Sequence, residues 1–219
     1  MIDGKQIDAG HPLLAQLRNG LLWHRTNPAA FRQIREDGFL RPLKGTTSRW
    51  GNRPYACQTL GAICLFDFTT EPEKRVLETA NRWQQFMGDE QPVTIVMGME
   101  AANLPGRLVR YPETRDGTPS DSGGPIPWVE VCHVGEIPIS AVVSYLLVCP
   151  VDYTRFKRCA QFDDQTLSDV EREFSEIIRI DEEDHARMIE GLQVHPVASE
   201  FEARLEQARR RIEEMGDRQ

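Results

Sequence analysis

The sequence predicts an α+β domain over residues 1–162, followed by an acidic helical appendage over residues 163–219. Three observations support this division. Short apolar runs of strand-like length recur between residues 21 and 148, separated by turn-rich or helical stretches. From about residue 163 onward, apolar residues recur at helical spacing instead. The charge changes at the same place, because residues 163–219 carry 17 acidic and 8 basic side chains, net −9, whereas the residues before them are net +1.

The first strand is predicted over residues 21–26, and a helix follows it directly. Asn27 and Pro28 are an N-cap residue and a first-turn proline. The helical segment ends at Gly38, which is typical of the residue that follows the last turn of a helix. We therefore expect a strand–helix unit that ends at Gly38.

Four further strands are predicted from apolar runs, over residues 61–68, 92–99, 128–134 and 141–148. Thr70 and Glu73 form a capping box, which predicts a helix after the first of these strands. The polar, turn-rich stretches 43–60 and 112–127 are predicted loops, and the first is expected to line a site. In the appendage, two capping boxes predict helix starts, Ser168/Glu171 and Ser199/Glu202.

Composition indicates a globular protein, with 40% hydrophobic residues, 27% charged residues and a net charge of −8. The five cysteines form no CxxC pair, so we expect free thiols in a reducing cytosol and no zinc or other metal site. The chain starts without a signal-peptide pattern and contains no apolar run of about 18 residues. These features predict a cytoplasmic protein that does not use a membrane.

Two of the predicted strands carry polar groups where a core strand is expected to be apolar. His24 and Thr26 are two residues apart, so their side chains point to the same face of the strand. Glu130 lies between two valines, where a carboxylate is costly unless something binds or uses it. A histidine and a hydroxyl can bind sugar hydroxyls, and a glutamate can stabilise a cationic sugar-like transition state. The alternatives are a hydrogen-bonded core histidine and a glutamate that pairs with an arginine.

Basic side chains gather beside His24 and Thr26. Residues 25–53 hold seven basic side chains and only two acidic ones. Together with the helix start after Thr26, this patch suits a phosphate-bearing ligand, and the loop position of Arg49 makes it a candidate phosphate ligand. A solvated surface is the alternative. With Glu130, these parts fit cleavage of the N-glycosidic bond of a dinucleotide such as NAD.

Four stretches in this order resemble the ADP-ribosyltransferase superfamily, in its histidine–tyrosine–glutamate type. They are Leu-Trp-His-Arg-Thr (22–26), Asp-Gly-Phe-Leu-Arg-Pro (37–42), Gly-Ala-Ile-Cys-Leu-Phe-Asp-Phe (61–68) and Trp-Val-Glu-Val-Cys-His-Val-Gly-Glu-Ile-Pro-Ile-Ser-Ala-Val (128–142). The resemblance covers residues 21–148 and not the appendage. It implies a split β-sandwich of two facing small sheets with flanking helices, and an enzyme that uses NAD as a co-substrate.

The resemblance implies a role for each candidate residue. His24 would bind the nicotinamide ribose, and Thr26 would support it. Glu130 would hold the 2′-hydroxyl of that ribose and stabilise the oxocarbenium-like state as nicotinamide leaves.

The remaining site residues also follow from the resemblance. The aromatic residue that stacks on nicotinamide would be Tyr55 or Phe66, and Arg25 would contact the pyrophosphate. Trp128 stands where arginine-modifying members have Glu or Gln, which argues against an arginine acceptor. Nucleic-acid bases and other protein side chains stay open as acceptors.

The function that we expect from the sequence is NAD-dependent transfer of ADP-ribose to a nucleic acid or protein, in an intracellular toxin or phage-defence effector. An antitoxin or another protein partner is left open. The alternative is a non-catalytic binding module of the same fold that acts through its acidic helices. A third option is an RNA-processing transferase of the same superfamily that acts on a phosphate.

Overall fold

The computed structural model describes residues 7–42, 57, 60–69, 87, 91–110 and 129–193. Several sequence predictions fall outside these residues: the helix at Thr70/Glu73, the loop 112–127, the capping box Ser199/Glu202, and the site residues Arg49 and Tyr55.

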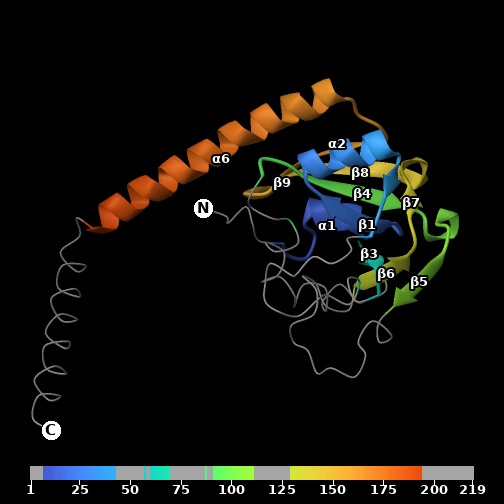
Figure 1. Cartoon of the computed structure of the whole chain (residues 1–219). Helices are drawn as coiled ribbons and strands as arrows, with labels where there is room; N and C mark the ends of the chain where they lie inside the picture. The colour runs from blue at the N-terminus through green and yellow to red at the C-terminus, as the bar shows by residue number, and fades with distance from the viewer. Residues whose placement is uncertain are drawn as a thin grey trace, which may run out of the picture. The chain divides into compact units, whose positions relative to one another are not determined.

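The described strands form one seven-stranded sheet and one two-stranded sheet, so the fold is α+β (Figure 1). The strand order in the large sheet is β5-β6-β3-β1-β4-β8-β9, and its registered pairs are antiparallel. Its strands are β1 (Leu22–Thr26), β3 (Ala62–Phe66), β4 (Thr94–Met99), β5 (Arg107–Arg110), β6 (Glu130–Val134), β8 (Val142–Cys149) and β9 (Asp152–Cys159). The small sheet pairs β2 (Phe39–Leu40) with β7 (Ile137–Pro138). Two facing small sheets are expected from the sequence, and the described strands instead place β1 at the centre of one large sheet.

The five predicted strands are confirmed as β1, β3, β4, β6 and β8. Sequence patterns do not predict β5 and β9, and both strands lie at the edges of the large sheet. An edge strand is open to water along one side, so its residues need not be apolar. β9 is a clear case, because Tyr153 is its one fully buried residue and its exposed positions carry Thr, Arg and Lys side chains.

The predicted strand–helix unit is confirmed at both ends of α2 (Pro28–Asp37). The Asn27 side-chain Oδ1 accepts a hydrogen bond from the Ala30 N–H at 2.8 Å. Gly38 ends the helix in the left-handed region at φ 75°, and its N–H donates to the Ile34 carbonyl. Local sequence is therefore sufficient to begin and end this helix.

The predicted helical character of the appendage is confirmed over α6 (Asp164–Gln193), and residues 194–219 lie outside the described residues. The start of the helix differs from the prediction at Ser168/Glu171, because the Asp163 carboxylate caps it by accepting from the Thr166 N–H at 2.8 Å. Glu171 lies inside the helix and pairs instead with Arg32 of α2 at 2.8 Å. The chain forms two compact units, Met1–Ser175 and Glu176–Gln219, so that their boundary falls within α6. None of the described helices is long and apolar enough to cross a membrane.

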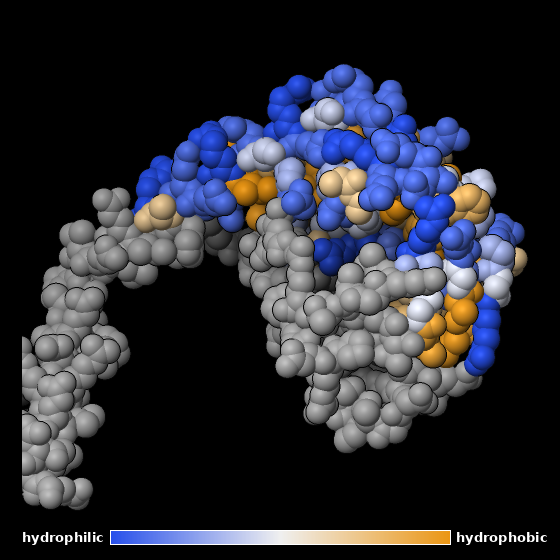
Figure 2. Space-filling view, in the orientation of Figure 1, coloured by the Kyte–Doolittle hydropathy of each residue, from blue (hydrophilic) through white to orange (hydrophobic). Residues whose placement is uncertain are grey.

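Two short helices in the described part of the chain cover opposite faces of the large sheet. Short 3-10 turns lie at Ala101–Asn103 and Ile139–Ala141. On one face, α1 (Pro12–Leu17) packs on Trp23, whose indole N–H donates to the Leu17 carbonyl at 2.9 Å. On the other face, Phe31 of α2 packs edge-on against Tyr145, with ring centroids 5.8 Å apart. The described surface in Figure 2 is largely hydrophilic, with hydrophobic residues in smaller areas.

We predict that Gly98→Ala destabilises the fold by about 1–3 kcal/mol through overpacking. A Cβ at residue 98 would lie 2.6 Å from the Trp23 ring, and because this indole is fully buried, any shift of the ring would disturb the packing around it. Chemical denaturation measures the effect. In the double variant with Trp23→Phe, the smaller ring should make the combined loss less than the sum of the two single losses. Strict additivity would contradict this account.

Candidate functional site

Glu130 begins strand β6 and faces a group of cysteine side chains. Its Cα is paired across the strands with Phe66 of β3, and the residue keeps only 9% of its surface exposed. The Cys64 thiol donates a hydrogen bond to Glu130 Oε1, with Sγ 3.1 Å from that oxygen. Cys64 lies two residues from Phe66 on β3, so the strand register itself brings this thiol and this carboxylate to the same face.

Cys57 and Cys132 form a disulfide, which corrects the expectation that all five cysteines are free thiols. Their Cα atoms are 5.3 Å apart although 75 residues separate them in the sequence. Only the fold brings these two positions within reach of one another, so cysteine spacing could not predict the bond. Cys64, Cys149 and Cys159 are free.

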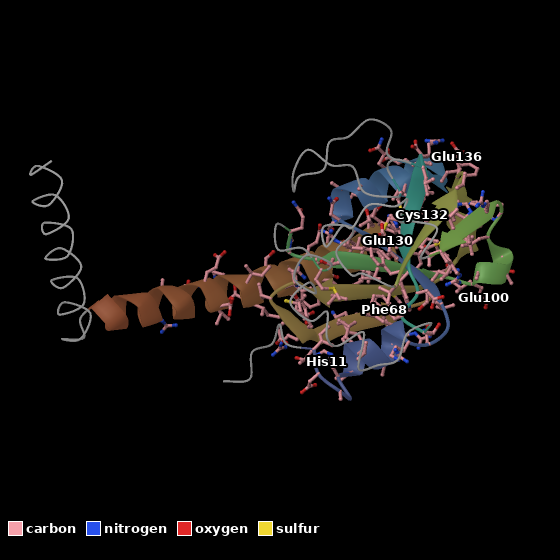
Figure 3. All side chains as sticks on the ribbon, turned by 90° about the horizontal axis from the view of Figure 1, so that it is seen from below. His11, Phe68, Glu100, Glu130, Cys132 and Glu136 are labelled. Carbon is pink, nitrogen blue, oxygen red and sulfur yellow. A yellow bond between two sulfur atoms is a disulfide. The ribbon has the colours of Figure 1, made fainter. Side chains whose placement is uncertain are left out.

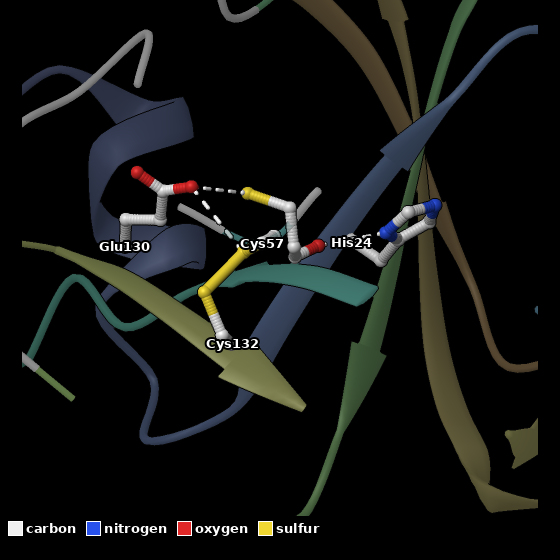
Figure 4. The surroundings of a disulfide bond; sticks show 5 residues. His24, Cys57, Glu130 and Cys132 are labelled. Carbon is white, nitrogen blue, oxygen red and sulfur yellow. Dashed lines mark hydrogen bonds between the residues drawn. A yellow bond between two sulfur atoms is a disulfide. The ribbon is translucent and has the colours of Figure 1, made fainter. Parts of the chain in front are cut away.

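The disulfide lies directly beside the carboxylate. Cys57 Sγ is 3.4 Å from Glu130 Oε1, and Cys132 follows Glu130 by two residues on the same face of β6 (Figures 3 and 4). A disulfide sulfur carries no proton, so this second contact is one of packing and not a hydrogen bond. Glu130 Oε1 therefore lies between one thiol and one disulfide sulfur.

Whether this cluster can hold a metal depends on the disulfide. The ligand atoms of Cys57, Cys64 and Glu130 lie within 4.8 Å of one another. Structural zinc sites use four ligands, and a cysteine binds zinc as a thiolate. With Cys57 and Cys132 joined, the cluster offers one thiol and one carboxylate. The disulfide form therefore does not supply a zinc ligand set.

Burial and charge both act on the Cys64 thiol. Burial raises its pKa well above the ordinary value, and the neighbouring Glu130 carboxylate raises it further. Each effect disfavours the thiolate, the first through lost solvation and the second through like-charge repulsion. Cys64 is therefore a thiol at neutral pH, and it keeps its hydrogen bond to Glu130.

His24 lies on β1 and is bonded to the main chain of the same cysteine. Its Nδ1 is 2.9 Å from the Cys64 carbonyl oxygen, and because a carbonyl only accepts, Nδ1 carries the proton. Burial, with a smaller contribution from the Arg25 charge, lowers the pKa of His24 despite the opposing effect of this hydrogen bond. The ring is thus neutral at pH 7, and Nε2 is an acceptor without a partner among the described residues.

The sheet places His24 and Glu130 on opposite faces. Trp23 is paired with Phe66, and Phe66 with Glu130, so these three side chains share one face. His24 follows Trp23 and points the other way. Cys64 links the two residues, because its carbonyl oxygen bonds His24 while its thiol bonds Glu130.

The remaining candidate residues have different surroundings. Thr26 is buried on the same face as His24, and its hydroxyl has no hydrogen-bond partner among the described residues. Arg25 is exposed. Phe66 is 4% exposed and stacks on Phe68 with ring centroids 6.3 Å apart, so its ring belongs to the core.

Cysteines 57, 64 and 132 are the site residues that sequence reasoning did not identify. The sequence does indicate the position of Cys132, because side chains alternate along a strand and Cys132 therefore points to the same face as Glu130. The pairing of β3 with β6 and the position of Cys57 both depend on contacts between distant parts of the chain.

Comparisons with known proteins identify no family for this chain. No family model matches it, and no curated protein or solved structure matches it either.

We predict that alkylation of Cys64 by iodoacetamide reaches half its maximal rate at a pH above about 8.5, the ordinary value for a thiol. Glu130→Gln removes the negative charge and should move this midpoint to lower pH. Mass spectrometry of the alkylated peptides follows each cysteine separately. Cys159 is the internal control, because burial alone raises its pKa and the Glu130 substitution should leave it unchanged. An unmoved Cys64 midpoint would show that Glu130 does not act on this thiol.

Proposed function

We propose that this protein is an NAD-dependent ADP-ribosyltransferase, which releases nicotinamide and transfers ADP-ribose to a nucleic acid or protein. The observation that carries the proposal is the bonding of His24 and Glu130 to the same residue, Cys64. The neutral imidazole and the carboxylate bond Cys64 from opposite faces of the sheet, and they would meet one ribose where the sheet divides between β1 and β3. Such a pair fits the recognition of a ribose and the stabilisation of a cation formed from it.

His24 is suited to bind a ribose because its tautomer is determined by the protein. The Cys64 carbonyl holds the proton on Nδ1, and Nε2 is left to accept a hydrogen bond from a sugar hydroxyl. The Thr26 hydroxyl lies on the same face. The first turn of α2 starts two residues after Thr26, and helix N-termini favour the phosphates of a dinucleotide.

Glu130 would act when the bond between ribose and nicotinamide breaks. Nicotinamide leaves with the bonding electron pair, and positive charge develops on the ribose carbon and ring oxygen. A carboxylate with little exposure to water interacts strongly with that charge, which exists only in and near the transition state. The acceptor nucleophile then forms the new glycosidic bond.

The split β-sandwich is part of this proposal. β1 and β3 are registered at the single pair Trp23↔Phe66 among the described residues. Beyond that pair, the His24 side chain bonds the Cys64 carbonyl that a strand partner would otherwise engage. This interruption is where the sheet would divide into β5-β6-β3 and β1-β4-β8-β9, with NAD bound between the two parts.

A non-catalytic binding module is the second candidate function, and one observation favours it. Glu130 Oε1 is already in contact with two sulfurs, and Phe66 is buried in the core. In this reading the exposed acidic side chains of α6 hold a partner, and no NAD is cleaved.

The first test measures the rate at which the Glu130→Gln variant releases nicotinamide from labelled NAD. The substitution keeps the shape of the side chain and removes its charge, so turnover should fall by about 100-fold or more while the protein stays folded. The assay is run with and without a dithiol reductant, so that the state of the Cys57–Cys132 disulfide cannot hide activity. Glu136→Gln, an exposed glutamate paired with Arg41, is the matched control and should keep full activity. A wild-type chain that is silent in both redox states with nucleic-acid and protein acceptors would favour the binding module.

The second test is the affinity of the chain for NAD. His24→Ala removes the Nε2 acceptor, and NAD binding should weaken by about 1–3 kcal/mol, the usual range for a lost polar partner. Isothermal titration calorimetry measures this change, and a denaturation curve verifies that the variant is folded. Equal affinity in the folded variant would remove His24 from the site.

A further inference from the structure

Three sulfur atoms meet at one carboxylate on the β3–β6 pair. Cys57 and Cys132 are joined, and the free Cys64 lies directly opposite Cys132 on the neighbouring strand. Cys64 Sγ and Cys57 Sγ lie within 4.8 Å of one another. A thiol at this distance from a disulfide sulfur needs only a small movement to reach it.

The three cysteines differ in their exposure to solvent. Cys57 is 3% exposed and Cys132 is fully buried, whereas Cys64 is only partly buried. A thiol in solution therefore cannot reach either sulfur of the disulfide without local opening of the fold. The exposed part of the cluster is Cys64.

Glu130 holds the Cys64 thiol beside the disulfide. Its Oε1 is 3.1 Å from Cys64 Sγ and 3.4 Å from Cys57 Sγ. The thiol and the sulfur to be attacked thus contact the same carboxylate oxygen. Because the carboxylate also disfavours the Cys64 thiolate, it restrains the reaction of this thiol at neutral pH.

We propose that Cys57, Cys64, Cys132 and Glu130 form a thiol–disulfide exchange site that low-molecular-weight thiols enter through Cys64. The Cys64 thiol loses its proton to water or hydroxide, and the thiolate attacks Cys57 Sγ. A Cys57–Cys64 bond forms, the Cys57–Cys132 bond breaks, and the Cys132 thiolate takes up a proton from water. This step changes the partners of the disulfide without net oxidation or reduction.

An external thiol completes the reaction. It attacks Cys64 Sγ in the Cys57–Cys64 bond, forms a mixed disulfide on Cys64 and leaves Cys57 as a thiol. A second thiol molecule then releases Cys64, so two thiols become one external disulfide and the protein gains two electrons and two protons. This thiol–disulfide exchange is an activity separate from ADP-ribosyl transfer and does not depend on it.

The experiment measures how fast glutathione, used as the probe, reduces the Cys57–Cys132 disulfide in the full chain. Samples are quenched with iodoacetamide, and the alkylated peptides are quantified by mass spectrometry. Cys64→Ser removes the entry thiol and should slow the reduction about tenfold or more, because attack on the buried sulfurs then requires local opening. Cys159→Ser is the matched control, since Cys159 is also a partly buried free thiol, and should react at the wild-type rate.

Two further measurements separate exchange from a structural effect. In concentrated guanidinium chloride, wild type and Cys64→Ser should be reduced equally fast, because every sulfur is then accessible. Glu130→Gln removes the charge that disfavours the Cys64 thiolate, so it should speed the reduction at neutral pH and have little effect at high pH, where Cys64 is ionised in both proteins. Equal native rates for wild type and Cys64→Ser, or absence of the Cys57–Cys132 bond in the unreduced chain, would overturn the proposal.

Discussion

The register between β3 and β6 determines what Glu130 can do. The pairs Phe66↔Glu130 and Cys64↔Cys132 put the carboxylate and two cysteines on one face. A slip of one residue would move Glu130 to the other face and separate it from Cys64. Cys64 also fixes the ring of His24. Its carbonyl oxygen bonds His24 of β1, while its thiol bonds Glu130. The chemistry proposed for this protein depends on one correctly paired strand.

Two buried carboxylates near this strand show how surroundings decide the role of an acid. Asp67 follows β3 and is paired with Arg110 at 2.6 Å. Burial alone would raise its pKa, but hydrogen bonds from Thr69 and Arg110 lower the pKa overall. Asp67 is therefore a stable anion with a structural partner. Glu130 has the Cys64 thiol and the Cys57 disulfide sulfur in contact with its Oε1, so its surroundings place it beside redox-active atoms.

The two proposals assign Glu130 to different reactions at one place. In ADP-ribosyl transfer the carboxylate must meet a ribose, and in thiol exchange it holds the Cys64 thiol beside the disulfide and disfavours its thiolate. Both effects are strong because little water surrounds the carboxylate. Cys64 connects the two reactions, since it also positions the ring of His24.

The sequence by itself determined the local elements and the residues of unusual polarity. The N-cap at Asn27, the helix end at Gly38 and the alternation that marks Glu130 all depend on neighbours within a few positions. Only the tertiary structure decided that Cys57 and Cys132 are bonded, that Phe66 belongs to the core, and that His24 and Glu130 occupy opposite faces but share Cys64. The physical reason is that strand order and register arise from contacts between segments far apart in the chain, and no local pattern encodes which strands become neighbours.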